Sequence, residues 1–361
     1  MSYQWDEINE LWLAGSRVSL SSDQLVDSFN TAERLLSHEW MDAQRFNNGY
    51  VQSGPYITLY VAAIGRMLGV IESVADVNEL VTRLKTRDRA ALSELMAAFL
   101  CLRGNPNVNL EFGINIRVGN RIKQPDFRLR VGSDTWTHVE VTAPDNSIQQ
   151  KHAQSTLDSI TMLLPEFLDG TVVEVLLLRG PTDKEVIQLC TEVRILIENP
   201  TRVIKLVNNL AVIALNVAQL ELDVLRNYKE QLGPMLCVSR AEVGKARKNI
   251  SVSIPVVDQR AMNFLRIEAR QLTASEKGIV MIDMKSICAG IKKWKVLLEH
   301  RLQPKIHTRV SGICLFRYAC EDTPDGEAIV PETLVIENRF ARNPMPHWLC
   351  EQLITTSRVP V

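Results

Sequence analysis

The sequence predicts an α/β protein in which a mixed β-sheet is flanked by helices and preceded by a mainly helical region. The main observation is the order of elements between Asp88 and Arg179, which reads helix, three strands, helix, strand. This order favours a mixed sheet covered by helices. The last strand, residues 172–178, is a nearly continuous apolar run, which is typical of a strand buried on both faces.

The predicted elements divide the chain at about residue 86. Residues 1–86 form the expected N-terminal helical region, and residues 87–361 form an α/β domain with an elaborated C-terminal half. In this domain a helix over residues 90–103 begins at the N-cap Asp88 and stops at Gly104. The further elements are strands at 110–118, at Asp126, at Glu140 and at 172–178, and a helix at 147–167. Helices at 183–198 and 258–272 and strands near 211–215, 235–238, 278–283, 309–316 and 333–336 follow.

The stretch from Gln124 to Pro144 carries the candidate chemistry. It reads as two strands joined by a Gly-Ser-Asp turn, each with an acid where a structural strand would carry an apolar residue. Because side chains alternate along a strand, Asp126 and Glu140 can converge on one point from neighbouring strands. Two carboxylates arranged in this way suit a hard divalent cation, so we expect a site for Mg²⁺ or Mn²⁺.

These residues resemble the signature of the PD-(D/E)XK nuclease superfamily, the restriction-endonuclease-like fold. Pro125-Asp126 matches the first half of the signature and Glu140-Val141-Thr142 matches the second, with Thr142 where the family has lysine. The resemblance implies that Asp126 and Glu140 bind the metal. It also implies that Glu94, on the small-residue side of the upstream helix, adds a third carboxylate. The predicted catalytic set is therefore Glu94, Asp126, Glu140 and Thr142.

The missing lysine removes a fixed positive charge that the family places beside the scissile phosphate. Threonine can hydrogen-bond a water but carries no charge. Lys123, just before the Pro-Asp pair, and Lys151, in the following helix, are the candidate substitutes. The candidate nucleic-acid contacts are Lys123, Arg128, Lys151, Lys293 and Trp294. Here a basic run around Trp294 could hold a phosphate backbone and stack on a base.

Composition limits the class of protein and its setting. The chain has 361 residues, of which 46% are hydrophobic and 23% charged, with a net charge of −1. These values are ordinary for a globular protein, and any nucleic-acid surface must be a local patch. Seven scattered cysteines without a C-x-x-C pair argue against a disulfide framework or a zinc ribbon. With no signal peptide or membrane span expected, the predicted location is the cytoplasm.

The resemblance implies a metal-dependent endonuclease that hydrolyses DNA, of the restriction or anti-phage defence kind. Family members often pair to cut two strands, so a homodimer is also implied. The alternative, favoured by Thr142, is a weak or inactive nuclease-fold protein that binds nucleic acid or a protein partner. Two plainer interpretations stay open. The hairpin acids could be solvated residues paired with Arg128 and Arg130, and the chain could be an unrelated α/β scaffold.

Overall fold

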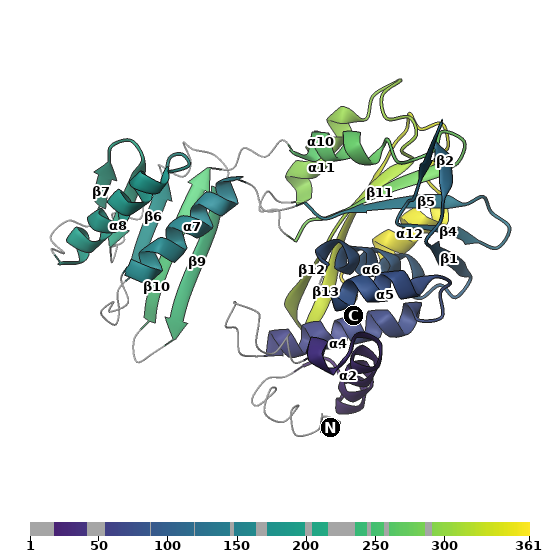
Figure 1. The fold of residues 1–361 in the computed structure, drawn as a ribbon, viewed down its shortest axis with the longest axis horizontal. Coiled ribbons are helices and arrows are strands. Elements are labelled where there is room, and N and C mark those ends of the chain that lie inside the picture. The colour runs from purple at the N-terminus through teal and green to yellow at the C-terminus, as the bar shows by residue number, and fades with distance from the viewer. Residues whose placement is uncertain are drawn as a thin grey trace. The chain divides into compact units, whose positions relative to one another are not determined.

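The chain forms two compact units in the computed structural model (Figure 1). The first unit takes in the described residues of 1–144, 260–286 and 291–361, and the second takes in those of 145–259. The second unit is therefore inserted into the sequence of the first. The structure describes residues 18–41, 55–86, 88–118, 120–144, 148–163, 172–198, 204–215, 235–243, 247–255, 260–285 and 291–361.

A six-stranded mixed sheet is the centre of the first unit, in the order β1-β4-β5-β11-β12-β13. β5, β11 and β12 run parallel, whereas the β1/β4, β4/β5 and β12/β13 pairs are antiparallel. The strands are β1 (Val108–Phe112), β4 (Phe127–Val131), β5 (Thr137–Thr142), β11 (Lys277–Asp283), β12 (Gly312–Thr323) and β13 (Gly326–Glu337). The predicted α/β class with a mixed sheet is confirmed.

Both faces of this sheet are covered. On one face, α6 (Arg89–Leu102) packs on β1 and β5, and its Cys101 Sγ lies 4.0 Å from Met281 Sδ of β11. Val280 and Ile282 alternate with Met281 and are also fully buried, so the opposite face is covered as well. Two helices with contacts to the sheet are α10 (Arg260–Glu268), which touches β5, and α11 (Ile291–Arg301), which touches β12 and β13.

The helix predicted from its N-cap is confirmed as α6. The Asp88 carboxylate accepts a hydrogen bond from the Ala90 amide at 2.9 Å, which satisfies one of the free donors at the helix start. Ten residues of α6 are buried, Glu94 among them, because the helix lies between the sheet and the N-terminal helices. The small residues on the Glu94 side allow this close packing.

The N-terminal helices belong to the first unit. α2 (Ser22–Leu36), α4 (Pro55–Ile71) and α5 (Val77–Lys85) share one hydrophobic cluster with α6 and the sheet, and α12 (His347–Thr355) joins it. α4 crosses α2 so closely at Gly65 that a Cβ there would lie 1.9 Å from the Ser28 carbonyl oxygen. The structural division of the chain therefore does not coincide with the boundary predicted near residue 86.

The second unit has a five-stranded sheet of its own, in the order β7-β8-β6-β10-β9. Its elements are α7 (Ile148–Leu163), β6 (Val172–Leu177), α8 (Asp183–Glu198), β7 (Ile204–Val207), β8 (Ala211–Leu215), β9 (Met235–Val243) and β10 (Arg247–Pro255). The expectation that the helix at 147–167 and the strand at 172–178 complete the first sheet is wrong. The apolar run predicts a strand buried on both faces, but not the sheet in which that strand pairs, and β6 pairs with β8 and β10.

The strand predicted over residues 110–118 is two strands. β1 ends at Phe112, and Gly113, with φ +66°, turns the chain out of the sheet. β2 (Ile116–Val118) then pairs antiparallel with β3 (Arg121–Lys123) in a separate two-stranded ribbon. The ribbon returns directly to Gln124, Pro125 and Asp126.

In the described part of the chain, no helix is long and apolar enough to cross a membrane. The cytoplasmic location stays a prediction.

Candidate active site

Asp126 and Glu140 lie opposite each other at one end of the β4–β5 pair. The register pairs Phe127 with Val139, and its continuation by one residue brings Asp126 opposite Glu140. Opposed residues of an antiparallel pair project to the same face, so the expected convergence of these two acids follows from the register. Asp126 Oδ2 accepts the Val141 amide at 2.6 Å. Glu140 is only 6% exposed, and its Oε1 has no hydrogen-bond partner among the described residues.

Glu94 approaches Asp126 from α6. The residue is 4% exposed, and its carboxylate lies within hydrogen-bond reach of Asp126. Arg83 of α5 holds both Glu94 oxygens, with Nη1 at 2.8 Å and Nη2 at 2.7 Å, and also donates to Asp88 at 2.8 Å. Such a bidentate, charge-assisted pair fixes the orientation of the carboxylate. Arg83 has no motif of its own, so the sequence does not single it out.

A fourth acid, Glu268, completes the cluster. It is the last residue of α10, and its carboxylate accepts a hydrogen bond from the Thr142 hydroxyl, which lowers its pKa against a larger rise caused by burial. Its negative charge also raises the pKa values of Asp126 and Glu140. The sequence offers no signal for Glu268, because 125 residues and the whole second unit separate it from Thr142, so the prediction missed it.

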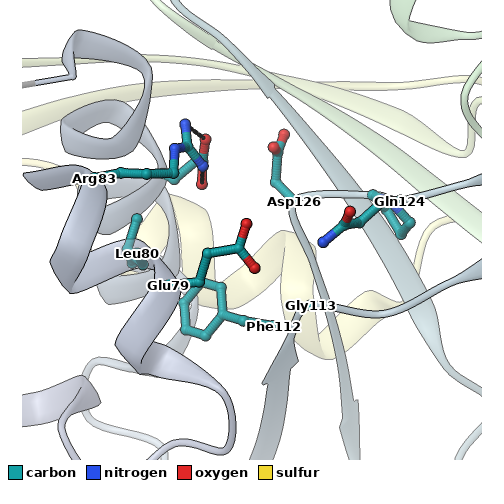
Figure 2. Close-up of a pocket in the computed structure, with 9 residues that line it drawn as sticks. Glu79, Leu80, Arg83, Phe112, Gly113, Gln124 and Asp126 are labelled. Atoms are coloured by element: carbon teal, nitrogen blue, oxygen red, sulfur yellow. Dashed lines mark hydrogen bonds and ion pairs between the residues drawn. The ribbon is translucent and has the colours of Figure 1, made fainter.

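A polar pocket of about 280 Å³ opens beside these acids. Glu79 and Arg83 line it from α5, Glu94 from α6, and Gln124 and Asp126 from the segment before β4 (Figure 2). Glu79 is exposed at its rim, whereas Glu94 is buried at its wall. The pocket gives solvent a way to two of the three predicted metal-binding acids.

Burial and mutual repulsion shift the protonation of the cluster. Burial, reinforced by the charge of Asp126, raises the pKa of Glu140 to about 9. Burial and the charge of Glu94 raise the pKa of Asp126 to about 7, although the Val141 amide opposes the shift. Burial also raises the pKa of Glu94, against the lowering effect of Arg83. Carboxyl groups that are buried and repel one another need a nearby positive charge to stay ionised.

A divalent cation would meet that need, and the oxygen donors fit Mg²⁺ or Mn²⁺. The unpartnered Oε1 of Glu140 and the second oxygen of Asp126 are the available ligands. In the arrangement that the structure describes, however, no group of three or more His, Cys, Asp or Glu residues has metal-binding geometry. Arg83 occupies both oxygens of Glu94. Glu94 is thus a third ligand only if Arg83 releases one oxygen.

Of the two candidate substitutes for the missing lysine, Lys123 lies at the site. Its positive charge lowers the pKa of Glu140, against the larger effect of burial. Lys151 lies on α7 of the second unit, and its role stays a prediction. The structure adds a cation that the sequence did not suggest, the guanidinium of Arg83.

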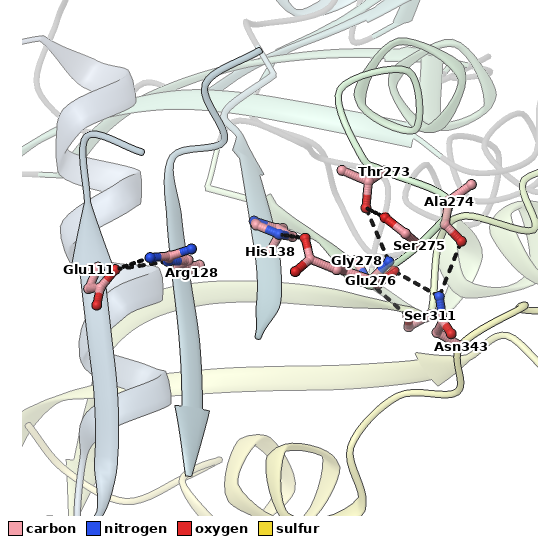
Figure 3. Close-up of polar contacts among 10 residues, drawn as sticks. All are labelled: Glu111, Arg128, His138, Thr273, Ala274, Ser275, Glu276, Gly278, Ser311 and Asn343. Atoms are coloured by element: carbon pink, nitrogen blue, oxygen red, sulfur yellow. Dashed lines mark hydrogen bonds and ion pairs between the residues drawn. The ribbon is translucent and has the colours of Figure 1, made fainter. Parts of the chain in front are cut away.

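His138, on the same strand as Glu140, is part of a structural network. Its ring is fully buried, and Nε2 hydrogen-bonds the Glu276 carboxylate in the loop before β11 (Figure 3). Asn343 Nδ2 donates to the carbonyl oxygens of Ala274 and Glu276 at 3.3 and 3.0 Å, which holds the same loop. His138 therefore anchors the approach to β11 and not the pocket.

The remaining candidate nucleic-acid residues, Arg128, Trp294 and Lys293, differ in their structural surroundings. Arg128 pairs with Glu111 at 2.6 Å (Figure 3). Its guanidinium lies 4.1 Å from the centre of the Trp136 ring, which Arg130 also contacts. Trp294 is fully buried and stacks on Phe264, so the prediction that it stacks on a base is wrong. A single tryptophan in a basic run does not reveal which side of the helix is covered. For Lys293, on the same helix, nucleic-acid contact stays a prediction.

Comparisons with known proteins do not assign a family. No family model matches the chain, and no curated protein matches it. Among solved structures, the central domain of yeast acetyl-CoA carboxylase aligns with 11% identity over 88% of this chain, at a TM-score of 0.17. The chain spans 58% of that structure. A TM-score of this size carries no information about fold or function.

Proposed function

We propose that the first unit is a metal-dependent phosphodiesterase of the PD-(D/E)XK kind that hydrolyses DNA. The observation that carries the proposal is a cluster of three acids, the buried Glu94 and Glu140 and the partly buried Asp126, of which Glu94 and Asp126 line one polar pocket. Glu140 is buried and its Oε1 has no partner among the described residues. Such an acid is expensive to keep, so it is more readily explained by chemistry than by stability.

The order of elements supports the same proposal. α6, β1, β4, β5, α10 and β11 follow one another as helix, three strands, helix and strand, which is the core order of the superfamily. The second unit interrupts this order between β5 and α10, and β11 pairs parallel with β5 with Val280 beside Glu140. The core order thus supports the nuclease interpretation through elements other than those first predicted.

In this proposal Asp126 and Glu140 would hold the cation. Bound Mg²⁺ would lower the pKa of a water and withdraw charge from a phosphate oxygen. Lys123 brings positive charge to the Glu140 side of the cluster. Arg83 keeps Glu94 pointed at Asp126, and Thr142 keeps Glu268 in place through its hydroxyl. The experiment that tests the proposal is Mg²⁺- or Mn²⁺-dependent nicking of plasmid DNA.

Two observations favour a second candidate function, a nuclease-fold protein that binds nucleic acid without cutting it. Arg83 neutralises Glu94, and Thr142 stands where the family has lysine. In this alternative the purified protein binds duplex DNA but does not nick it in Mg²⁺ or Mn²⁺, and neither does its Thr142→Lys variant.

Replacing Thr142 should distinguish the effect of a positive charge on the nicking rate from the effect of the threonine hydrogen bond. Thr142→Lys should keep or raise the nicking rate, because an ammonium group facing Glu268 restores the fixed charge of the family motif. Thr142→Ala should lower the rate by about tenfold at most, since it removes one hydrogen bond and no charge. Initial nicking rates at saturating metal measure both effects. Loss of all cleavage in Thr142→Ala, with folding and metal binding intact, would give the hydroxyl a direct chemical role and contradict this prediction.

A further inference from the structure

The charged residues of the β2–β3 ribbon are all basic. From Gly113 to Pro125 it carries three cations, Arg117, Arg121 and Lys123, and no acid, in a protein of net charge −1. The ribbon is a sheet of its own, and its pairing brings Arg117 opposite Ile122 and Val118 opposite Arg121. Its cations therefore project from both faces of the ribbon. A concentrated basic element of this kind complements a polyanion.

Ile122 gives the ribbon an apolar side chain that the fold does not use. It is 74% exposed although Arg121 and Lys123 flank it, and Arg121 is exposed as well. Among the described residues, no element covers Ile122, so packing there does not account for an isoleucine. Arg117 lies opposite Ile122 in the pairing and therefore on the same face of the ribbon. An exposed apolar residue beside a cation is suited to contact the base edges of a duplex while the cation contacts a phosphate.

The foot of the ribbon lies at the candidate active site. Gly113, where the chain leaves β1, and Gln124, where it returns, line the same pocket as Glu94 and Asp126. Lys123 is three residues from Asp126, and its charge acts on Glu140. A polyanion bound along the ribbon would therefore run past the acids.

We propose that the β2–β3 ribbon is the duplex-DNA-binding element of the first unit. Ile122 enters the groove, and Arg117, on the same face of the ribbon, contacts the phosphate backbone. The major groove of B-DNA admits a two-stranded ribbon, whereas a single strand offers no groove for Ile122. The proposal rests on the proposed function, because it names the substrate class of the same site as duplex DNA.

The test measures binding without cleavage. Fluorescence anisotropy of a labelled short duplex is titrated with the full chain in EDTA, for wild type and for the double variant Arg117→Ala, Ile122→Ser. We expect the double variant to bind about tenfold more weakly and its log–log salt dependence to become less steep by about one, the loss of one phosphate contact. Both side chains are exposed, so circular dichroism should show the same unfolding transition as wild type.

A matched control is the double variant Lys305→Ala, Ile306→Ser, which removes an exposed cation and an adjacent exposed isoleucine elsewhere in the first unit. It should bind like wild type. Three results would overturn the proposal: no duplex binding by wild type, equal binding by wild type and ribbon variant, or tighter binding of a single strand of equal length. The outcome is independent of cleavage. If wild type binds DNA through the ribbon but never cuts it, the binding proposal holds and the proposed nuclease activity is contradicted.

Discussion

Glu140→Gln should stabilise the metal-free protein at mildly alkaline pH. Glu140 is 6% exposed and its pKa is raised to about 9. At pH about 8 it is therefore protonated in the folded protein but ionised in the unfolded chain, and this difference costs stability. Glutamine has the shape of the protonated acid without this cost. The expected gain in the free energy of unfolding is ~2–5 kcal/mol at pH about 8.

The sign of the pH dependence follows from the direction of the shift. The folded pKa of Glu140 lies above the usual value of 4.5, so its contribution to stability falls as pH rises from about 4.5 to about 9. The advantage of Glu140→Gln should therefore vanish at pH about 4, where Glu140 is mostly protonated in both the folded and the unfolded wild type. Urea denaturation in EDTA at both values measures this difference. The control Glu111→Gln, a partly exposed acid paired with Arg128, should change stability by less than about 1 kcal/mol at either pH. Equal stability of Glu140→Gln and wild type at alkaline pH would show that Glu140 is not a strained, buried acid.

Removing both sheet carboxylates should abolish divalent-cation binding. In the double variant Asp126→Ala, Glu140→Ala, calorimetry should detect no Mn²⁺ binding. Of the two acids that remain, Glu94 has both oxygens held by Arg83, and Glu268 accepts a hydrogen bond from Thr142. Wild type should bind Mn²⁺ more weakly as pH falls, since protons compete for acids whose pKa values are about 7 and about 9. Glu111→Gln serves again as the control and should bind like wild type. Unchanged Mn²⁺ affinity in the double variant would place any metal elsewhere.

The local part of the site could be predicted from the sequence. Asp88, as N-cap, defines the start of α6 and with it the position of Glu94 on a helix of small residues. The short turn after β4 makes antiparallel pairing with β5 the expected result, and pairing brings Asp126 and Glu140 to one face. These inferences succeeded because they depend on residues close in sequence.

The long-range part could not be predicted. β11, the parallel neighbour of β5, follows after the inserted second unit, while the closer and equally apolar β6 pairs elsewhere. Hydrophobic pattern predicts burial but does not choose between two such strands. The same holds for the charged groups. Arg83 and Glu268 reach the cluster through tertiary packing of α5 and α10, and neither has a motif that would distinguish it from a surface charge.

The proposed function requires the acid cluster to hydrolyse DNA with a bound cation. Nicking of supercoiled plasmid in Mg²⁺ and in Mn²⁺, each with an EDTA control, tests it most directly when wild type is compared with Asp126→Asn and Glu111→Gln. Asparagine keeps the size of Asp126 but removes the charge that would bind the metal. We expect wild type and Glu111→Gln to nick only with metal, and Asp126→Asn not to nick at all. Wild type that never nicks, or Asp126→Asn that nicks at the wild-type rate, would contradict the proposed function.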